Sequence, residues 1–389
     1  MLELFKRIFK IKPKYIEFCK NSSWMLDACK LLPDYGNIKK CREFATLKQT
    51  KQNKKYHKEG NVWNHTVLVT KEMYKIINNE LAHLSIRDKG IMMLAALCHD
   101  LGKATTTYFD KTDNDWHCKS HGLAGERITR NLIYAEKDYN LREEVCWLVR
   151  WHMTFHHFLE KSESEQLDVL KKLSMGYSTI EKLLWLNIAD SRGSKSSDNT
   201  REMIENKFRE IKELAERNKC YRQPYKSTDK KKSNFTVYIM IGLPGSGKDT
   251  YIRKFIPNIE CICRDDIREE VLDGNVIGRK LYFDNAKETV VTDIVNSRIK
   301  KCCEEKKSFV INQTNVKKKY RTQLIQTAEK YGATHFVYIY VEAPSVEECK
   351  KRRGNGKWDS IIDRMWNDFE FPDRSECDDL IFYKNNWLC

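Results

Sequence analysis

Hydrophobic and polar positions follow two different patterns in the two halves of the chain. Between residues 60 and 217, apolar residues recur at spacings of three and four, which is the pattern of helices with one buried face. The clearest segments are 63–77, 91–102, 124–135, 141–153 and 179–190. The first half is therefore predicted to be all-α.

Beyond residue 233, short runs of β-branched and aromatic residues alternate with helical segments. The runs are 236–241, 259–263, 309–312 and 335–341. Apolar strands separated by helices are typical of a parallel sheet that is covered on both faces. The second half is therefore predicted to be an α/β domain, and residues 366–389 could either complete its sheet or pack against the first domain.

The polar stretch between the two patterns divides the chain into predicted domains. Residues 218–233 are charged and contain Pro224, which is the composition of a linker. The expected organisation has four parts: a basic N-terminal helical extension (1–58), an all-α domain (59–217), the basic linker (218–233) and an α/β domain (234–389).

Composition narrows the class of protein. The 389 residues are 41% hydrophobic, with no apolar run near the ~18 residues of a membrane span and no signal peptide in the opening residues. The 14 cysteines are scattered and form no CxxC pair, which favours reduced thiols. A cytoplasmic protein with no membrane association is expected.

Positive charge is concentrated in two segments. Lys and Arg exceed Asp and Glu by 70 to 55, and the excess lies in residues 1–58 (15 basic, 5 acidic) and 218–233 (6 basic, 1 acidic). Such segregation favours a polyanionic partner such as a nucleic acid. A solvated lysine-rich surface would give the same count, so charge alone leaves both interpretations open.

Nine of the ten histidines lie within residues 57–157. The adjacent pair His99 and Asp100 ends an apolar segment, and further imidazoles and carboxylates fall on other predicted helices. Together these ligands suit a transition metal better than calcium. The other candidates are His65, His121, His152 and Asp190.

The strings HKEGNVWNHTVLV and CHDLGK, in this order, resemble the HD phosphohydrolase superfamily, in particular the HD domains of bacterial tRNA nucleotidyltransferases. The resemblance covers about residues 55–195. It implies that Asp100 bridges two divalent metal ions in a phosphoesterase, and that Lys103 adds positive charge at the phosphate. One metal would be completed by His65, His99 and Asp190, and the other by His121 and His152.

Five further histidines lie in the same part of the chain. His156 follows His152 by one predicted helical turn and is a rival for the same ligand position; His157 is a weaker one. His57, His83 and His117 have no assigned role and are expected to be ordinary surface histidines.

The string GLPGSGKDT, from Gly242 to Thr250, follows a predicted strand and precedes a helix. This is the context of a P-loop, in which backbone N–H groups and Lys248 hold the phosphates of ATP or another NTP. Asp249 stands where Ser or Thr usually helps to hold Mg²⁺ or Mn²⁺, and Thr250 could supply the hydroxyl instead. The expected ATP-binding residues are Gly242, Gly245, Ser246, Gly247, Lys248, Asp249 and Thr250.

The rest of the α/β half resembles the 5'-hydroxyl polynucleotide kinase domain of a phage end-healing enzyme. The matching strings are GLPGSGKDT, RDDIR, YFDNAK, QTNVKKKYR and KKRRGNGK. The resemblance makes Asp265 the general base, Arg268 a ligand of the substrate phosphate, and Arg352 or Arg353 a lid arginine. Gln313 stands where the family usually has Asp.

Nearly the whole chain resembles the bacterial HD-Pnk end-healing enzymes. The resemblance implies hydrolysis of 2',3'-cyclic or 2'-phosphate ends and phosphorylation of 5'-hydroxyl ends of RNA or DNA, with a separate ligase acting downstream. Two alternatives remain open. The HD domain could hydrolyse free nucleotides while the P-loop domain phosphorylates a small molecule, or Asp249 and Gln313 could mark a P-loop that only binds NTP and regulates the HD domain.

Overall fold

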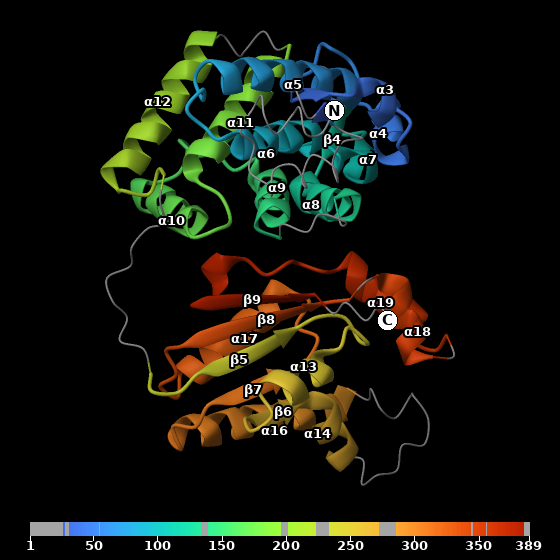
Figure 1. Ribbon diagram of the computed structural model, residues 1–389, viewed down its shortest axis with the longest axis vertical. Coiled ribbons are helices and arrows are strands. Elements are labelled where there is room, and N and C mark those ends of the chain that lie inside the picture. Colours follow the sequence, from blue (N-terminus) through green and yellow to red (C-terminus); the bar gives the residue numbers. More distant parts are fainter. Residues whose placement is uncertain are drawn as a thin grey trace, which may run out of the picture. The chain divides into compact units, whose positions relative to one another are not determined.

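The structure is a computed structural model. It describes residues 26–27, 31–53, 55–133, 139–195, 201–222, 233–271, 285–343, 345–354 and 356–384. The chain divides into two compact units, Met1–Tyr225 and Lys226–Cys389 (Figure 1). Three parts of the chain that the sequence analysis singled out lie outside the described residues: most of the expected linker, residues 1–25 of the expected N-terminal extension and the first half of the YFDNAK string.

The first unit is built mainly of helices, as its apolar periodicity predicts. Its helices are α3 (Tyr35–Ile38), α4 (Arg42–Thr46), α5 (Val62–Asn78), α6 (Ile86–Cys98), α7 (Lys103–Thr106), α8 (His121–Leu132), α9 (Tyr139–Trp151), α10 (Glu163–Ser174), α11 (Ile180–Gly193) and α12 (Arg201–Arg217).

Helix α6 is central to this unit because it is apolar on every side. Its residues from Gly90 to Cys98 are all buried, and it packs against α5, α9 and α11. The side chain of Ser85 caps its N-terminus by accepting a hydrogen bond from the N–H of Asp88. The helix therefore ends at a fixed point deep in the core, where His99 and Asp100 follow.

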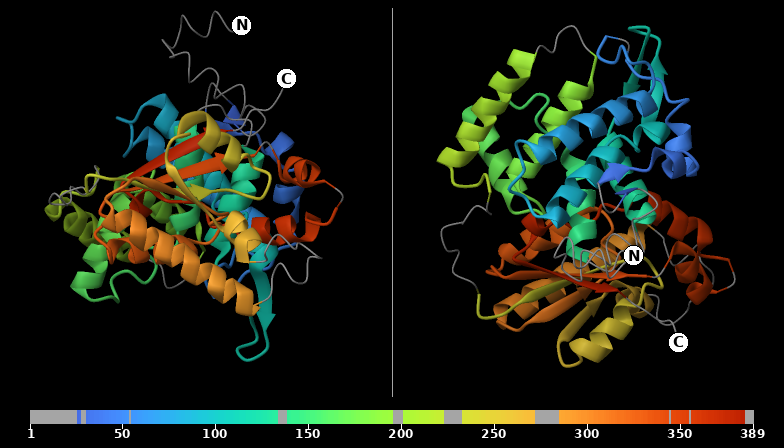
Figure 2. Two further views of the ribbon diagram at one scale, coloured as in Figure 1. Left: turned by 90° about the horizontal axis from the view of Figure 1, so that it is seen from below. Right: turned by 45° about the horizontal axis from the view of Figure 1, so that its top comes forward.

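Two short antiparallel strand pairs accompany the helices, and the helical periodicity did not predict them. They are β1 (Leu26–Asp27) with β2 (Leu32–Pro33), and β3 (Thr107–Asp110) with β4 (Asp115–Cys118). The second pair is a hairpin between α7 and α8, and Figure 2 shows it projecting from the helices of this unit. The unit is therefore helical with a small β component.

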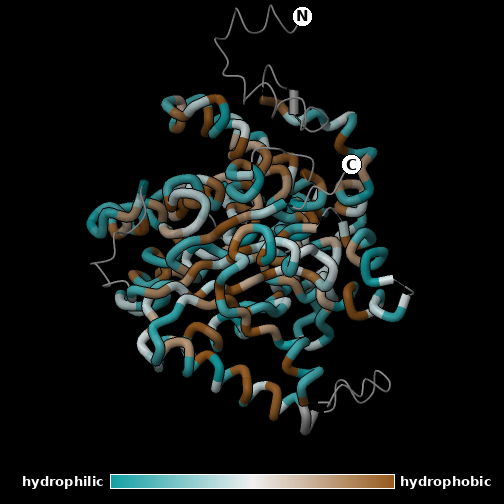
Figure 3. The backbone as a smooth tube through the Cα atoms, turned by 60° about the horizontal axis from the view of Figure 1, so that its bottom comes forward, coloured by the Kyte–Doolittle hydropathy of each residue, from teal (hydrophilic) through white to brown (hydrophobic). Residues whose placement is uncertain are grey.

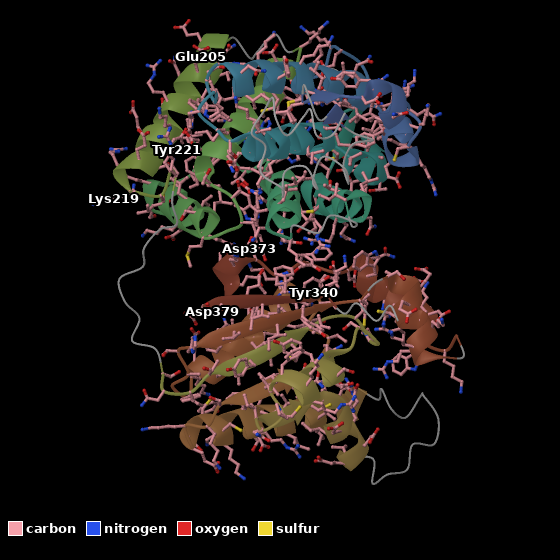
Figure 4. The ribbon with its side chains drawn as sticks, in the orientation of Figure 1. Glu205, Lys219, Tyr221, Tyr340, Asp373 and Asp379 are labelled. Carbon is pink, nitrogen blue, oxygen red and sulfur yellow. The ribbon has the colours of Figure 1, made fainter. Side chains whose placement is uncertain are left out.

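The end of α12 returns the chain to the core of the first unit. Lys219 adopts a left-handed backbone (φ 54), and the buried Tyr221 then accepts a hydrogen bond from the N–H of Glu181 at 3.0 Å (Figure 4). On α12 itself, Glu205 lies 3.3 Å from Arg192 of α11. These contacts fix α12 against α11.

The second unit is an α/β domain. Its strands are β5 (Val237–Ile241), β6 (Glu260–Cys263), β7 (Phe309–Asn312), β8 (Phe336–Glu342) and β9 (Asp379–Lys384). Its helices are α13 (Lys248–Phe255), α14 (Arg264–Val271), α16 (Asn285–Glu304), α17 (Lys318–Glu329), α18 (Val346–Arg353), α19 (Asp359–Asn367) and the 3₁₀ helix η1 (Arg374–Glu376).

All five strands of this sheet are parallel, in the order β6-β7-β5-β8-β9. Four of them lie where the apolar runs predict them. The fifth, β9, pairs with β8, so the C-terminal segment completes the sheet; Figure 4 marks Asp379 at its start and Asp373, which caps η1. The connections after β5 and β7 run to opposite sides, which opens a crevice at their carboxyl ends.

Helices cover both faces of the sheet. The buried residues of α16, α17 and α19 pack on one face, and those of α13 pack on the other. Along α16, hydrophobic and hydrophilic positions alternate, as Figure 3 shows, because only one side of this helix meets the sheet. The predicted fold class, a helical domain followed by an α/β domain with a parallel sheet, is confirmed.

Among the helices that the structure describes, none combines the length and the apolar character needed to cross a membrane.

Candidate active sites

Six predicted metal ligands meet inside the first unit, each at or near the end of a helix. Asp190 lies in α11, and the other five are contributed by α5, α8 and the residues that follow α6 and α9. All six are buried: His65, His99, Asp100, His121, His152 and Asp190. The predicted grouping of side chains that are far apart in the sequence is thus present in the fold.

Asp100 lies at the centre of this cluster. Its Oδ2 is 3.3 Å from Nε2 of His99 and 3.6 Å from Nε2 of His65. Its Oδ1 is 3.5 Å from Nε2 of His121 and 3.8 Å from Nε2 of His152. Each carboxylate oxygen therefore faces a different pair of imidazoles, which is the arrangement that two bridged cations require.

Asp190 joins only one of the two pairs. Its Oδ1 is 2.8 Å from Nε2 of His65 and 3.7 Å from Nε2 of His99. The other pair is closed by the two imidazoles themselves, since Nε2 of His121 lies 3.1 Å from Nε2 of His152. The split into a three-residue set and a two-residue set around Asp100 is the one that the resemblance implies.

Backbone and carboxylate contacts orient three of the imidazoles. Nδ1 of His99 donates to the carbonyl of Ala96 at 2.8 Å, and Nδ1 of His152 donates to the carbonyl of Val149 at 2.7 Å. Nδ1 of His65 lies 3.0 Å from a carboxylate oxygen of Glu59. These contacts leave Nε2 of each ring directed at Asp100, as in histidines that bind metals.

The pKa values of the imidazoles divide in the same way as the contacts. Burial lowers the pKa of His121 to about 4 and that of His152 to about 3, so both rings are neutral at pH 7. Burial opposes protonation of His99 too, but Asp100 and Asp190 outweigh it and raise its pKa to about 10. The two buried carboxylates thus attract positive charge.

Divalent metal ions fit this cluster. Among the described residues, His65, His99 and Asp100 form one group whose ligand atoms could share an ion, and Asp100, His121 and His152 form a second. Asp100, the residue shared by both groups, is buried. Imidazole nitrogen with carboxylate oxygen suits Zn, Mn, Fe, Co or Ni.

Lys103 is buried beside the cluster, at the start of α7. Its Nζ lies 2.8 Å from Oδ2 of Asp100 and donates to Oε1 of Gln52 at 3.0 Å. Burial alone would lower the pKa of Lys103, but Asp100 raises it, so the ammonium stays charged. The amide nitrogen of Gln52 is buried without an acceptor, which leaves a free donor next to Lys103.

Gln52 and Glu59 were missed as site residues by sequence reasoning. Glu59 lies within the HKEGNVWNH string, so a signal for it was present; Gln52 lies before that string and no pattern indicated it. Glutamine and glutamate are common on surfaces. Only the fold brings Gln52 to Lys103 and Glu59 to His65.

Two expectations about individual histidines need correction. His156 was expected on the same helical face as His152, but α9 ends at Trp151 and the following turn leaves His156 exposed. His57 was expected to be an ordinary surface residue, but its Nδ1 lies 2.8 Å from Glu59, the partner of His65. It therefore supports the cluster from outside.

The remaining histidines lie away from the cluster. His83 and His157 are exposed, and Nδ1 of His157 lies 2.8 Å from the exposed Glu160. His117 is on β4, where its Nε2 lies 2.6 Å from Asp113.

In the second unit, the P-loop joins β5 to α13. Gly245 and Gly247 have φ values of 80° and 101°, a region that side chains with a Cβ rarely adopt. A Cβ on Gly245 would also lie 2.8 Å from the carbonyl of Cys349. The glycines therefore permit the tight turn that directs backbone N–H groups at a phosphate.

Lys248, the first residue of α13, is buried at the base of the loop. Its Nζ donates to the carbonyls of Gly242 at 3.1 Å and Leu243 at 2.9 Å. Burial lowers its pKa to about 8, and Asp249 partly opposes this. A buried ammonium held only by carbonyl groups is suited to an incoming anion.

Asp249 is held by the end of strand β7. The side-chain amide of Asn312 donates to Oδ1 of Asp249 at 2.7 Å. Thr250 lies next to it and lines the same cleft. Oxygen donors of the kind that Mg²⁺ prefers are therefore present beside the P-loop, although the residue order departs from the usual pattern.

Asp265 and Arg268 lie together at the start of α14. The guanidinium of Arg268 forms ion pairs with Asp265 and with Glu288 of α16. Glu288 also binds Arg264 at 2.7 Å. Asp265 is about half exposed, so its carboxylate is accessible from the cleft while Arg268 holds it in place.

The two candidate lid arginines, on α18, differ in their contacts. Arg352 donates to the carbonyl of Gly245 at 3.2 Å and to Glu348 at 2.9 Å. Arg353 is exposed and lies over the ring of Trp358, 5.3 Å from its centre. Arg352 is thus hydrogen-bonded to the P-loop, whereas Arg353 acts on it through its charge, which helps to lower the pKa of Lys248.

One cleft of about 1710 Å³ connects these groups. It is lined by the P-loop, the carboxyl ends of β6 and β7, and α18. Of the predicted kinase residues, the cleft lining includes Gly245, Gly247, Lys248, Asp249, Thr250, Asp265, Arg268, Arg352 and Arg353; Gly242 and Ser246 lie in the loop behind it.

The two units match two protein families. Residues 62–175 match the HD domain family, and residues 237–356 match the family described as AAA domain, whose P-loop is of the kinase-like kind. The chain therefore combines an HD domain with a kinase-like P-loop domain. This confirms the architecture expected from the resemblance to the HD-Pnk enzymes.

Particular relatives cover parts of the chain. It is 28% identical over 155 residues to the multifunctional CCA protein of Pasteurella multocida. The aligned segment is 39% of this chain and 34% of that protein. It is 27% identical over 144 residues to the L-seryl-tRNA(Sec) kinase of Methanococcus maripaludis. This aligned segment is 35% of this chain and 53% of that protein. The chain thus covers about a third to a half of these relatives.

A solved structure of the Pnkp1/Rnl/Hen1 complex matches 33% of this chain and 43% of the other chain, with 22% identity and a TM-score of 0.27.

Proposed function

We propose that the protein heals both ends of a broken nucleic-acid strand in the cytoplasm. The HD unit removes 2',3'-cyclic or 2'-phosphates, and the P-loop unit transfers the γ-phosphate of an NTP to 5'-hydroxyl ends of RNA or DNA. A separate ligase then joins the ends. The observation that supports the proposal is a buried cluster of possible metal ligands in one compact unit and a P-loop cleft in the other.

The chemistry of the HD centre follows from its residues. His65, His99, Asp100 and Asp190 would hold one divalent metal ion, and His121, His152 and Asp100 the other; such a pair activates water for attack on a phosphoester. Lys103 places a buried positive charge where phosphate oxygens would lie. The unpaired amide of Gln52 offers those oxygens a further donor.

In the kinase centre, Asp265 accepts the proton of the attacking 5'-hydroxyl. The hydroxyl oxygen forms a bond to the γ-phosphorus while the bond to the bridging oxygen breaks and the nucleoside diphosphate leaves. Lys248 exchanges its carbonyl partners for phosphate oxygens. Arg268 orients Asp265 and the acceptor, and Arg352 or Arg353 stabilises the transferring group.

The nature of the acceptor is supported by one relative. L-seryl-tRNA(Sec) kinase, by its name, phosphorylates a group that is attached to RNA. An acceptor hydroxyl carried by a nucleic acid therefore suits this P-loop unit better than a free small molecule.

The test uses a short RNA with a 5'-hydroxyl and a 2',3'-cyclic phosphate, incubated with ATP, Mg²⁺ and Mn²⁺. We expect Asp100→Ala to abolish only the 3'-end reaction and Lys248→Ala to abolish only the 5'-end reaction. If the wild-type protein changes neither end but acts on mononucleotides, the proposal is wrong. If Lys248→Ala alters the HD reaction while no kinase activity exists, the P-loop is regulatory.

A further inference from the structure

The hairpin of β3 and β4 is joined at both ends to the HD centre. Strand β3 begins four residues after Lys103, and β4 ends three residues before His121. The hairpin projects from the helices of its unit (Figure 2). A projecting element with both bases at a catalytic centre can contact whatever is attached to the phosphate there.

Side chains alternate between the two faces of the hairpin. Thr107 pairs with Cys118, and Phe109 pairs with Trp116, so these four residues share one face. Tyr108 and His117 lie on the opposite face. Each face can therefore be tested by a separate substitution.

The face that carries Phe109 begins beside residues of the HD centre. At its base, Thr107 follows Lys103 by four residues and Cys118 precedes His121 by three, and both are partly buried. Phe109 and Trp116 lie two residues further out, which is ~7 Å along the strands. The aromatic pair thus begins within one nucleotide's reach of Lys103.

The aromatic pair has the form of a stacking surface. The rings of Phe109 and Trp116 are 5.2 Å apart at an interplanar angle of 63°, and Phe109 is 42% exposed. An exposed phenyl ring next to an indole gains free energy by covering its face with another ring.

The charges of the hairpin decide which part of a nucleic acid can bind. Asp110, Asp113 and Asp115 lie at its outer end, and Lys111 is the one basic residue among them. Carboxylates repel a phosphate backbone, whereas a neutral base is unaffected. The surface is therefore suited to a nucleobase rather than to a run of phosphates.

We propose that the Phe109–Trp116 face is a nucleobase subsite of the HD centre, which stacks on the base of the terminal nucleotide whose phosphate is hydrolysed. This inference rests on the proposed function, because it takes the substrate to be a polynucleotide end. It assigns to the HD unit its own means of recognising a nucleotide.

The test compares two variants on two substrates with the full-length protein. Phe109→Ala removes the exposed ring of the proposed subsite, and Tyr108→Ala removes a similarly exposed ring from the opposite face. The substrates are an RNA with a 2',3'-cyclic phosphate and the same RNA with an abasic terminal nucleotide, both 5'-phosphorylated so that the kinase has no acceptor.

We expect Phe109→Ala to lower kcat/KM about 5- to 150-fold on the base-bearing RNA, the range for the loss of one stacked base. On the abasic RNA it should match the wild type. Tyr108→Ala should match the wild type on both. Equal activity of Phe109→Ala and the wild type on the base-bearing RNA overturns the proposal, as does an equal loss on the two substrates.

A binding measurement separates this inference from the proposed function. Affinity for the same RNA ending in a 2'-phosphorothioate is followed by the quenching of tryptophan fluorescence, with Trp116→Phe identifying the signal from the hairpin. If the wild type hydrolyses no RNA end, the proposed function is wrong. In that case the subsite is supported if Phe109→Ala weakens binding and Tyr108→Ala does not, and it is refuted if Phe109→Ala binds the RNA like the wild type.

Discussion

Glu59 provides the sharpest test of the HD centre because it is adjacent to the metal ligands without being one. Its carboxylate lies 3.0 Å from Nδ1 of His65 and 2.8 Å from Nδ1 of His57, and it is almost completely buried. Burial alone would raise its pKa, but the two imidazoles hold the pKa well below its ordinary value. Glu59→Gln keeps the shape and an acceptor oxygen and removes the charge.

The expected magnitude follows from this contact. A carboxylate on the far nitrogen of a ligating imidazole makes that ligand more basic and fixes its orientation, and its loss typically costs 10- to 100-fold in metal affinity, about 1.4–2.7 kcal/mol. Glu59→Gln should lie near the lower limit because the amide oxygen still accepts from His65. Glu59→Ala should lie near the upper limit.

The assay is calorimetric titration of the metal-free full-length protein with Mn²⁺, in the absence of nucleotide. Glu160→Gln is the matched control, because Glu160 also lies 2.8 Å from a histidine Nδ1 but is 72% exposed. Surface pairs of this kind contribute little, so this variant should change Mn²⁺ affinity less than about twofold. Phosphorylation of 5'-hydroxyl RNA reports whether the rest of the chain is intact.

Two results would refute the reasoning. If Glu59→Gln binds Mn²⁺ as tightly as the wild type, His65 is not a ligand or its orientation does not matter. If Glu160→Gln loses as much affinity as Glu59→Gln, the titration reports a general effect of charge and not the contact to His65.

Three further predictions concern single residues. Lys248→Ala should lower 5'-phosphorylation at least 100-fold and leave 3'-end hydrolysis unchanged, because Lys248 lies in the P-loop of the other unit; end-labelled RNA resolved on a gel measures both. Lys182→Met should destabilise the HD unit by about 3 kcal/mol in urea unfolding, because it removes the buried ammonium whose Nζ contacts the carboxylates of Asp88 and Glu144 at 2.7 and 2.6 Å. The pKa of Asp88 is lowered despite burial, mainly by Lys182, so this difference should be present at pH 7 and shrink as the pH falls through the ordinary range of an aspartate. Gly102→Ala should destabilise the same unit by about 3 kcal/mol or more, since the new Cβ would lie 1.9 Å from the carbonyl of His121; a thermal melt that matches the wild type would show that α8 can shift.

The parallel sheet and the set of metal ligands could be predicted from the sequence, because both depend on local patterns. Apolar runs predicted four of the five strands, and the positions of His65, Asp100 and Asp190 in the sequence assigned them to different helices or helix ends. Strand β9 was left undecided because its sequence is half polar, as expected for an edge strand that is partly exposed. Periodicity alone could not choose between the sheet and the other domain.

What the sequence could not supply were partners that depend on the tertiary fold. Asn312 was known only as the end of a strand, but its amide holds Asp249, the residue that departs from the usual P-loop pattern. Gln52 reaches Lys103 across 51 positions in the chain. The prediction that His156 shares a helical face with His152 was wrong because α9 ends at Trp151, and no glycine or proline follows to signal that end in the sequence.

The two centres approach phosphate by opposite electrostatic means. In the HD unit, Asp100 and Asp190 are buried among imidazoles of which two are neutral, so the centre attracts cations, and under the proposed function it would bind phosphate through them. In the P-loop unit, Lys248 is buried without a carboxylate on its ammonium, so the centre attracts the anion directly. Neither centre can substitute for the other, because a phosphate entering the HD cluster without metal ions would meet carboxylates. Two units with separate cores allow these opposite charge patterns to coexist in one chain.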